Sequence, residues 1–542
     1  MHRTRFSLST LPLILLVGLL ALPVLALLAS WLPWGVVQAD TGAILREMAS
    51  TVLPGYVWTT LWLGLWVAVG AAVVGTATAA AVTLFEFPGR RVFEWLLLLP
   101  LAMPAYVTAY AYTDFLQFSG PLQVGLRETF GLEGRLLPEV RSLWGAIWVF
   151  TFSLYPYVYL LARTALGERA AHLMEAARLL GAPLSRRITS IALPLARPAV
   201  AAGVALALME TLADFGVTSY FGIQTFTTGI IKAWLSMDNR IAAAQLSTML
   251  LALVLVLLWL EHRAERRMRF TAKGTGHAGA TEAQPVPLRG LARGLAWGVC
   301  TLPVFMGFVA PVAFMLRPLA SDWSVLPWSR FLEWAWNSVW LGGITAGLAV
   351  AVALALAFAV RRKPDLLTRG VVRLASVGYA VPGAVIVVGL LLPVGWVQAH
   401  FPQWGVGALV TTTAVGIVWA YLVRFCAVAL QSVQSGYARI PASLDDSARM
   451  LGAGSARLMA NVHWPLLRRS TAAAALLVFV DVMKELPATM VLRPFNSDTL
   501  AVVAYQLARD ERLGEAALPS LALVAVGLVP VILLSRTLRG RA

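Results

Sequence analysis

Two segments share a pattern of acidic, small and basic side chains suited to docking a partner. Residues 175–181 read EAARLLG and residues 446–452 read DSARMLG, and a proline follows each about a dozen residues later. The alanines favour helix and the glycine favours its end, so each segment predicts a short helix with a closely approachable surface. Alternatively, each segment is a solvated loop that only joins two helices. The recurrence of the same pattern in two places favours a role in docking a partner.

A second group of residues consists of paired carboxylates within apolar sequence. Glu210 and Asp214 are four apart, a spacing that places them on one helix face. Their repeat partners 271 residues on are Asp481 and Glu485, with Lys484 beside them. Ionisable groups inside a membrane are costly and usually face the bundle interior. The four carboxylates are thus expected to face a shared axis, either as a polar pathway or gate for a cation, or as a structural cluster with Lys484 as a counter-charge.

Other residues with chemical potential are assigned to structure. Tyr106, Tyr110 and Tyr112 are interpreted as aromatic packing more readily than as path-lining residues, and His172 and His463 as surface residues. Cys300 and Cys426 form no CxxC motif, and residues 274–279, GTGHAG, lack the strand and acidic residue of a dinucleotide site. The chain has no P-loop and no credible catalytic triad, so no catalytic residue, metal site or cofactor of its own is predicted.

The elements that must position these residues are membrane helices. The 542 residues are 59% hydrophobic and only 13% charged, which excludes an ordinary soluble enzyme and a disordered chain. Twelve apolar stretches are long enough to span a bilayer, and the first is expected to be a retained anchor helix. They lie near 11–33, 57–85, 92–114, 143–163, 198–220, 241–260, 295–316, 335–360, 374–396, 408–431, 471–491 and 517–535.

The distribution of basic residues predicts the orientation. If both termini are cytoplasmic, the cytoplasmic segments hold 30 of the 43 Lys and Arg residues and the external segments hold 11. This bias accounts for the net charge of +16 through anionic lipid headgroups, without any nucleic acid partner. Both of the short predicted helices, at 175–181 and 446–452, then face the cytoplasm.

An internal repeat divides the chain into two halves. Residues 58–64 read WTTLWLG and residues 336–342 read WNSVWLG, and the two loop motifs repeat at a slightly shorter offset. The predicted domains are 1–262 and 293–542, each with six helices, joined by a cytoplasmic linker at 263–292 that is basic and then rich in Gly, Ala and Pro. An even number of helices per half makes the repeats parallel about an axis along the membrane normal.

The loop pattern resembles the EAA motif of permease subunits of binding-protein-dependent ABC importers, and the resemblance covers the whole chain. It implies an all-α polytopic membrane protein with twelve transmembrane helices, two tandem permease domains of the type I importer fold. It also implies that ATP and Mg are bound by a separate ATPase subunit dimer that docks on each loop. The residues matching the motif are Glu175, Ala176, Ala177 and Gly181 in the first loop, and Asp446, Ser447, Ala448 and Gly452 in the second.

The second loop departs from the motif at Asp446 and Ser447, which puts its ion pair with an ATPase in doubt. Residues 99–106, 214–229 and 484–501 more narrowly resemble ferric iron permeases of this class. This implies a substrate-binding protein outside the cell membrane and import across a bacterial inner membrane. Thiamine, polyamine and sulfate permeases share the architecture and stay as alternatives, as does a secondary transporter that needs no ATPase.

Overall fold

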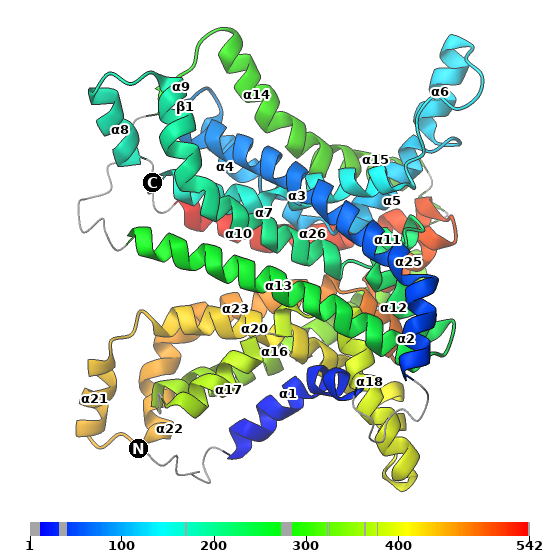
Figure 1. Cartoon of the computed structure of the whole chain (residues 1–542), viewed down its shortest axis with the longest axis vertical. Coiled ribbons are helices and arrows are strands. Elements are labelled where there is room, and N and C mark those ends of the chain that lie inside the picture. Colours follow the sequence, from blue (N-terminus) through cyan, green and yellow to red (C-terminus); the bar gives the residue numbers. More distant parts are fainter. Residues whose placement is uncertain are drawn as a thin grey trace. The chain divides into compact units, whose positions relative to one another are not determined.

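The computed structural model describes residues 11–31, 41–167, 171–272, 285–321, 323–324, 326–362, 365–376 and 378–539. These residues form two compact units. Unit 1 comprises residues 1–50, 229–251 and 328–503, and unit 2 comprises 51–228, 252–327 and 504–542. Almost every described element is helical (Figure 1).

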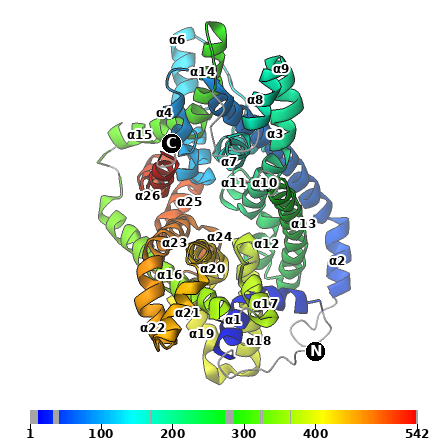
Figure 2. The ribbon, with the colours of Figure 1, turned by 90° about the vertical axis from the view of Figure 1, so that its left-hand side faces the viewer.

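Unit 2 is built on three long helices, α3 (Leu53–Leu84), α7 (Leu143–Ala165) and α10 (Leu193–Ala213), which pack on one another (Figure 2). Small residues permit this close packing. A Cβ on Gly75 of α3 would lie 2.6 Å from the Val158 Cβ and 2.8 Å from the Tyr155 carbonyl oxygen of α7. The remaining elements of this unit are α4 (Arg90–Leu96), η2 (Leu99–Ala102), α5 (Ala105–Leu116), α6 (Pro121–Phe130), α8 (Ala171–Leu179), α9 (Leu184–Arg187), η4 (Ile188–Ala192), α11 (Gly216–Tyr220), α14 (Leu291–Val304), η5 (Phe305–Val309), α15 (Ala310–Ser321) and α26 (Leu513–Arg539).

Unit 1 repeats this core with α16 (Trp328–Arg362), α20 (Ala414–Tyr437) and α23 (Trp464–Lys484). Its other elements are α1 (Leu11–Ala29), α2 (Thr41–Ser50), α17 (Leu366–Ser376), η6 (Gly378–Ala380), α18 (Gly383–His400), η7 (Pro402–Trp404), α19 (Val406–Thr412), α21 (Ala442–Met450), α22 (Ser455–Arg457), η8 (Leu458–His463) and α24 (Pro487–Leu492). Three helices have residues assigned to both units: α12 (Phe226–Leu235), α13 (Arg240–Ala272) and α25 (Leu500–Arg509). The core of three long packed helices thus occurs once in each unit, as the predicted internal repeat implies.

The two units are not contiguous sequence halves, because terminal helices are exchanged. The predicted first span, α1, packs in unit 1 against α17 and α18, and the Trp419 indole donates to the Leu19 carbonyl at 3.0 Å. Conversely, α15 packs in unit 2 against α5 and α26. The halves 1–262 and 293–542 stay a prediction about the repeat, and residues 273–284 of the predicted linker lie outside the described residues.

The far end of the linker is anchored to unit 2 by a short parallel pairing. Strand β1 (Phe85–Glu86) pairs with β2 (Val286–Pro287), with Phe85 opposite Val286. The Leu288 amide donates to the Glu86 carbonyl at 2.9 Å, and the Trp297 indole donates to the Pro88 carbonyl at 3.0 Å. The linker thus rejoins the helices at the turn that follows α3.

Among the described residues, ten helices are long and apolar enough to cross a membrane. A pair of segments, Arg90–Ala102 and Ala105–Phe130, passes the same test jointly but bends by 88°, which makes eleven if the pair is one span. The twelfth predicted stretch, 471–491, falls on α23 and α24. Arg468, Arg469, Asp481 and Lys484 shorten the apolar run there, so this span stays a prediction from the repeat.

In unit 2 the loop motif and the connection that contains α6 lie at different ends of the helices. Figure 1 shows α8 at one end of unit 2 and α6 at the other. This arrangement agrees with opposite sides of a membrane for the two kinds of connection.

Candidate functional site

The first loop motif folds into a helix, a left-handed glycine and a second helical turn. The helix α8 ends at Leu179, and Gly181, two residues further on, has a φ of +77°. The Ala182 amide donates to the Ala177 carbonyl at 2.9 Å and the Gly181 amide to the Arg178 carbonyl at 3.0 Å. This is the Schellman arrangement that a glycine at this position permits. The chain then continues through α9 and the π-helical η4 into α10.

The second loop motif has the same geometry. The helix α21 ends at Met450, and Gly452, two residues further on, has a φ of +81°. The Ala453 amide donates to the Ala448 carbonyl at 3.0 Å, and the Gly452 amide donates to the Arg449 carbonyl at 2.9 Å. A short helix, α22, and the π-helical η8 lead into α23. The sequence-based prediction of a short helix ended by glycine is confirmed for both loops.

Both loops present the same exposed surface. Of the motif residues, Glu175, Ala176, Asp446 and Ser447 are exposed, and Ala177 and Ala448 are half-buried. Beyond them, each helix end carries two apolar side chains that are almost fully exposed: Leu179 (85%) and Leu180 (87%), and Met450 (88%) and Leu451 (89%). Because exposed apolar side chains in equivalent places mark interaction sites, these four residues, which we call the apolar tips, suit a docking surface.

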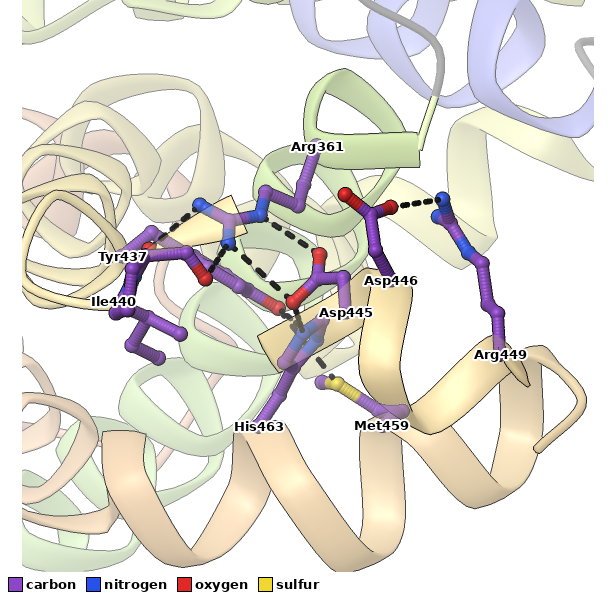
Figure 3. A network of polar contacts seen from close by, with 9 residues as sticks. Arg361, Tyr437, Ile440, Asp445, Asp446, Arg449, Met459 and His463 are labelled. Atoms are coloured by element: carbon purple, nitrogen blue, oxygen red, sulfur yellow. Dashed lines mark hydrogen bonds and ion pairs between the residues drawn. The ribbon is translucent and has the colours of Figure 1, made fainter. Parts of the chain in front are cut away.

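The two loops are held to their units by different side chains. Met174, buried at 6% exposure, anchors α8, and the equivalent residue in α21 is Asp445, buried at 4%. Asp445 accepts a hydrogen bond from the Arg361 Nε at 2.8 Å, and its carboxylate lies within hydrogen-bond distance of the His463 Nε2, at 3.0 Å (Figure 3). The other His463 nitrogen lies 3.2 Å from the Tyr437 hydroxyl.

Arg361 joins this network to the backbone as well. Its guanidinium donates to the Ile440 carbonyl at 2.9 Å and the Pro441 carbonyl at 3.0 Å, at the start of α21. Burial by itself raises the pKa of Asp445, but the hydrogen bonds from Arg361 and His463 outweigh burial and leave that pKa below its ordinary value. The second loop is therefore fixed by an ionic network around Asp445, whereas the equivalent position of the first loop holds the apolar Met174.

The prediction of a surface histidine is wrong for His463, which is fully buried against Phe358 and Tyr437. The side chain of His172 lies outside the described residues. Sequence reasoning missed Asp445 because the residue precedes the motif acid by one position and its partners are distant in sequence. The adjacent Asp446 instead forms an exposed ion pair with Arg449 at 3.6 Å, also drawn in Figure 3.

The paired carboxylates do not share a helix face, which corrects the sequence-based expectation. Helix α10 ends at Ala213 and α23 ends at Lys484, so Asp214 and Glu485 lie beyond the last helical residue with extended backbone. Glu210 and Asp481 remain inside these helices and are half-buried. The expected arrangement of all four around one axis stays a prediction, because the two pairs belong to different units.

Asp214 and Glu485 instead cap the short helix that follows each break. The Asp214 carboxylate accepts from the Val217 amide at 2.9 Å, and the Glu485 carboxylate accepts from the Ala488 amide at 3.0 Å and the Thr489 amide at 2.9 Å. A carboxylate at a helix start satisfies amides that have no partner within the helix. Pro487, at the start of α24, is the sequence signal that could have revealed this break.

Glu485 also has a buried counter-charge, Arg424, which sequence reasoning did not assign to it. The Arg424 guanidinium lies 3.3 Å from the Glu485 carboxylate, and the Glu485 side chain is only 1% exposed. Gly383 makes this approach possible, since a Cβ there would lie 2.5 Å from Glu485 Oε1 and 2.8 Å from the Arg424 guanidinium. Lys484, the counter-charge considered from sequence, is half-buried at the end of α23.

We expect Glu485→Gln to lower thermal stability more than Asp214→Asn. Removing one partner of a buried ion pair costs about 3–5 kcal/mol because the other charge stays buried, whereas Asn caps a helix about as well as Asp. Melting temperatures of the two variants in the same detergent measure the difference. Equal melting temperatures would show that the Arg424–Glu485 pair does not stabilise the fold.

The described residues contain no group of three or more His, Cys, Asp or Glu side chains that could hold a metal ion. The side chains of Tyr106 and Tyr110 pack with ring centroids 5.7 Å apart, and the Tyr112 hydroxyl donates to the Met306 carbonyl at 2.7 Å. Thus Tyr112 is a packing residue, as predicted from sequence.

Residues 71–270 match the family described as binding-protein-dependent transport system inner membrane component. This match covers less than half of the chain. The matched range contains the first loop motif, whose geometry the second loop repeats 271 residues on. Over this range the chain is similar to the permease domains of that family, and its described residues form the apolar helices of a multi-pass membrane protein.

Two similar proteins cover nearly the whole chain. The Fe(3+)-transport system permease protein FbpB 2 of Haemophilus influenzae is 27% identical over 484 residues, 88% of each chain. A probable ABC transporter permease, y4fN of Sinorhizobium fredii, is 24% identical over 89% of this chain and 87% of its own. The sulfate transport system permease protein CysT of Salmonella typhimurium is 28% identical over only 38% of this chain and 73% of its own.

Proposed function

We propose that this chain is a permease that imports ferric iron, which a separate binding protein delivers on the external side. The observation that carries the choice of substrate is coverage. The similarity to a permease named for Fe(3+) transport extends over 88% of the chain, whereas the similarity to the named sulfate permease extends over 38%. The alignment with the Fe(3+) permease therefore covers both halves of this chain, whereas the alignment with the sulfate permease covers less than half of it.

We further propose that two ATPase subunits drive transport through α8 and α21, with both termini in the cytoplasm. The apolar tips support this proposal, because four exposed apolar side chains in repeated geometry are costly in water unless a partner covers them. ATP and Mg would be bound by those subunits, and this chain would bind no cofactor. A transporter without an ATPase would leave the repeated tips without a role.

Reconstituted transport tests the substrate. The purified permease with its ATPase is placed in vesicles, and ferric, thiamine and sulfate ligands are offered, each with its own binding protein. We expect ATP-dependent uptake of iron at least tenfold above that of the other ligands. ATP-dependent uptake of thiamine or sulfate without iron would overturn the choice of substrate, and co-purification without any ATPase would overturn the driving partner.

A further inference from the structure

The Tyr110 hydroxyl is buried in unit 2 without a hydrogen-bond partner among the described residues. Its side chain is 1% exposed. Other buried tyrosines of the described structure differ in this respect, since the hydroxyl groups of Tyr112, Tyr155, Tyr159, Tyr421 and Tyr505 all have a partner within 3.0 Å. Tyr110 therefore stands apart from tyrosines that serve only packing.

Stability does not account for this hydroxyl. A buried polar group without a partner destabilises the fold, because it loses its hydrogen bonds to water and gains none in return. Phenylalanine would fill nearly the same volume at position 110 without that cost. In this structure the hydroxyl is therefore left available to a ligand.

Oxygen-bearing side chains surround Tyr110. The Tyr220 ring lies 4.8 Å away, edge to face, and the Tyr106 ring lies 5.7 Å away. Tyr505 and Asp214 are near enough to act on Tyr110 electrostatically. The Tyr505 hydroxyl lies 2.8 Å from the Ser219 hydroxyl.

The break after α10 places these groups around Tyr110. Since α10 ends at Ala213, the chain turns there and α11 brings Tyr220 beside α5. The approach is close, because a Cβ on Gly216 would lie 2.6 Å from the Tyr106 Cβ. The result is a group of phenol, hydroxyl and carboxylate oxygens contributed by α5, the segment after α10, and α25.

The charged residues at this site are compatible with a cation. The Arg141 guanidinium donates to the Tyr220 hydroxyl at 3.0 Å, but it also forms two bonds to the Glu511 carboxylate, at 2.6 and 2.8 Å. The negative charge of Glu511 therefore balances the positive charge of Arg141. With Asp214 included, these three residues have a formal charge of −1.

We propose that Tyr110 contacts the transported substrate at a transient site for a hard trivalent cation, with Tyr220, Tyr505 and Asp214 as neighbouring oxygen donors. The proposal rests on ferric iron as the substrate and assigns residues to its path. Hard cations prefer oxygen ligands, and tyrosine oxygen is a known ligand of iron. When the phenol binds, a metal–oxygen bond replaces its O–H bond and one proton is released.

Transport by Tyr110→Phe tests the site, with Tyr112→Phe on the same helix as the matched control. We expect Tyr110→Phe to lower ATP-dependent ferric uptake at least tenfold while its melting temperature stays the same or rises. Tyr112→Phe loses the bond to Met306, so we expect a lower melting temperature and unchanged uptake per folded molecule. Uptake by Tyr110→Phe at the native rate would overturn the site and leave ferric import standing.

A spectrum of the full chain tests binding without turnover. Ferric nitrilotriacetate is added to the purified chain, and phenolate bound to Fe(III) gives a charge-transfer band in visible light. We expect this band in the native chain and in Tyr112→Phe, its loss in Tyr110→Phe, and its weakening as pH falls because binding releases a proton. No band in the native chain, or an equal band in Tyr110→Phe, would overturn the site, whereas native vesicles that take up no iron would overturn the proposed substrate.

Discussion

The double variant Leu180→Asp, Leu451→Asp will lose its ATPase subunits and nearly all transport. Each side chain is almost fully exposed, so its replacement leaves the fold within about 0.5 kcal/mol. In a docked complex, however, each substitution removes about 1.5–3 kcal/mol of apolar burial and places a charge in the contact. Association weakens by at least 100-fold for the pair, as measured by co-purification and by ATP hydrolysis that depends on the loaded binding protein.

The matched control for the apolar tips is Leu366→Asp in α17. Leu366 is 87% exposed, as Leu180 is, but it lies outside both loop motifs. We expect this control to keep its ATPase and its transport. If the double variant retained the ATPase and hydrolysed ATP normally, the apolar tips would not be the docking surface, and a connection without a docking role would regain support.

Asp445→Asn will destabilise the chain by about 3 kcal/mol, because it leaves the largely buried Arg361 without its carboxylate. This figure is at the low end for a buried pair, since Arg361 keeps two backbone carbonyls as acceptors. The matched control is the neighbouring Asp446→Asn. Its ion pair with Arg449 is exposed, and surface pairs contribute about 0–1 kcal/mol.

The stability difference between native chain and Asp445→Asn also depends on pH in a defined direction. The folded-state pKa of Asp445 is lowered, so its contribution is present above the unfolded pKa of about 3.9 and is lost as pH falls through the folded value. We expect the gap in melting temperature to be constant above about pH 5 and to close below about pH 4. A gap that widened on acidification would contradict the assigned ionic network.

Sequence alone determined the features that depend on local pattern. Apolar runs predicted the helices, since a bilayer requires about 20 apolar residues per span, and the repeated motif predicted two short helices ended by Gly181 and Gly452. Backbone geometry confirms the two short helices, because helix propensity and the left-handed freedom of glycine act within a few residues. Of the twelve predicted spans, ten are confirmed among the described residues, or eleven if the bent pair is one span. The same local signals placed both acidic motif residues on exposed helix surface.

Only the tertiary structure decided how distant residues combine. The i, i+4 spacing of Glu210 and Asp214 suggested one helix face, but the chain leaves the helix after Ala213, because Asp214 caps the helix that follows. His463 becomes buried by meeting Tyr437 and Asp445, which lie 26 and 18 positions earlier in the chain. The exchange of α1 and α15 between units likewise depends on which apolar faces pack best, and the hydrophobic effect, being non-directional, leaves that choice to the three-dimensional fit.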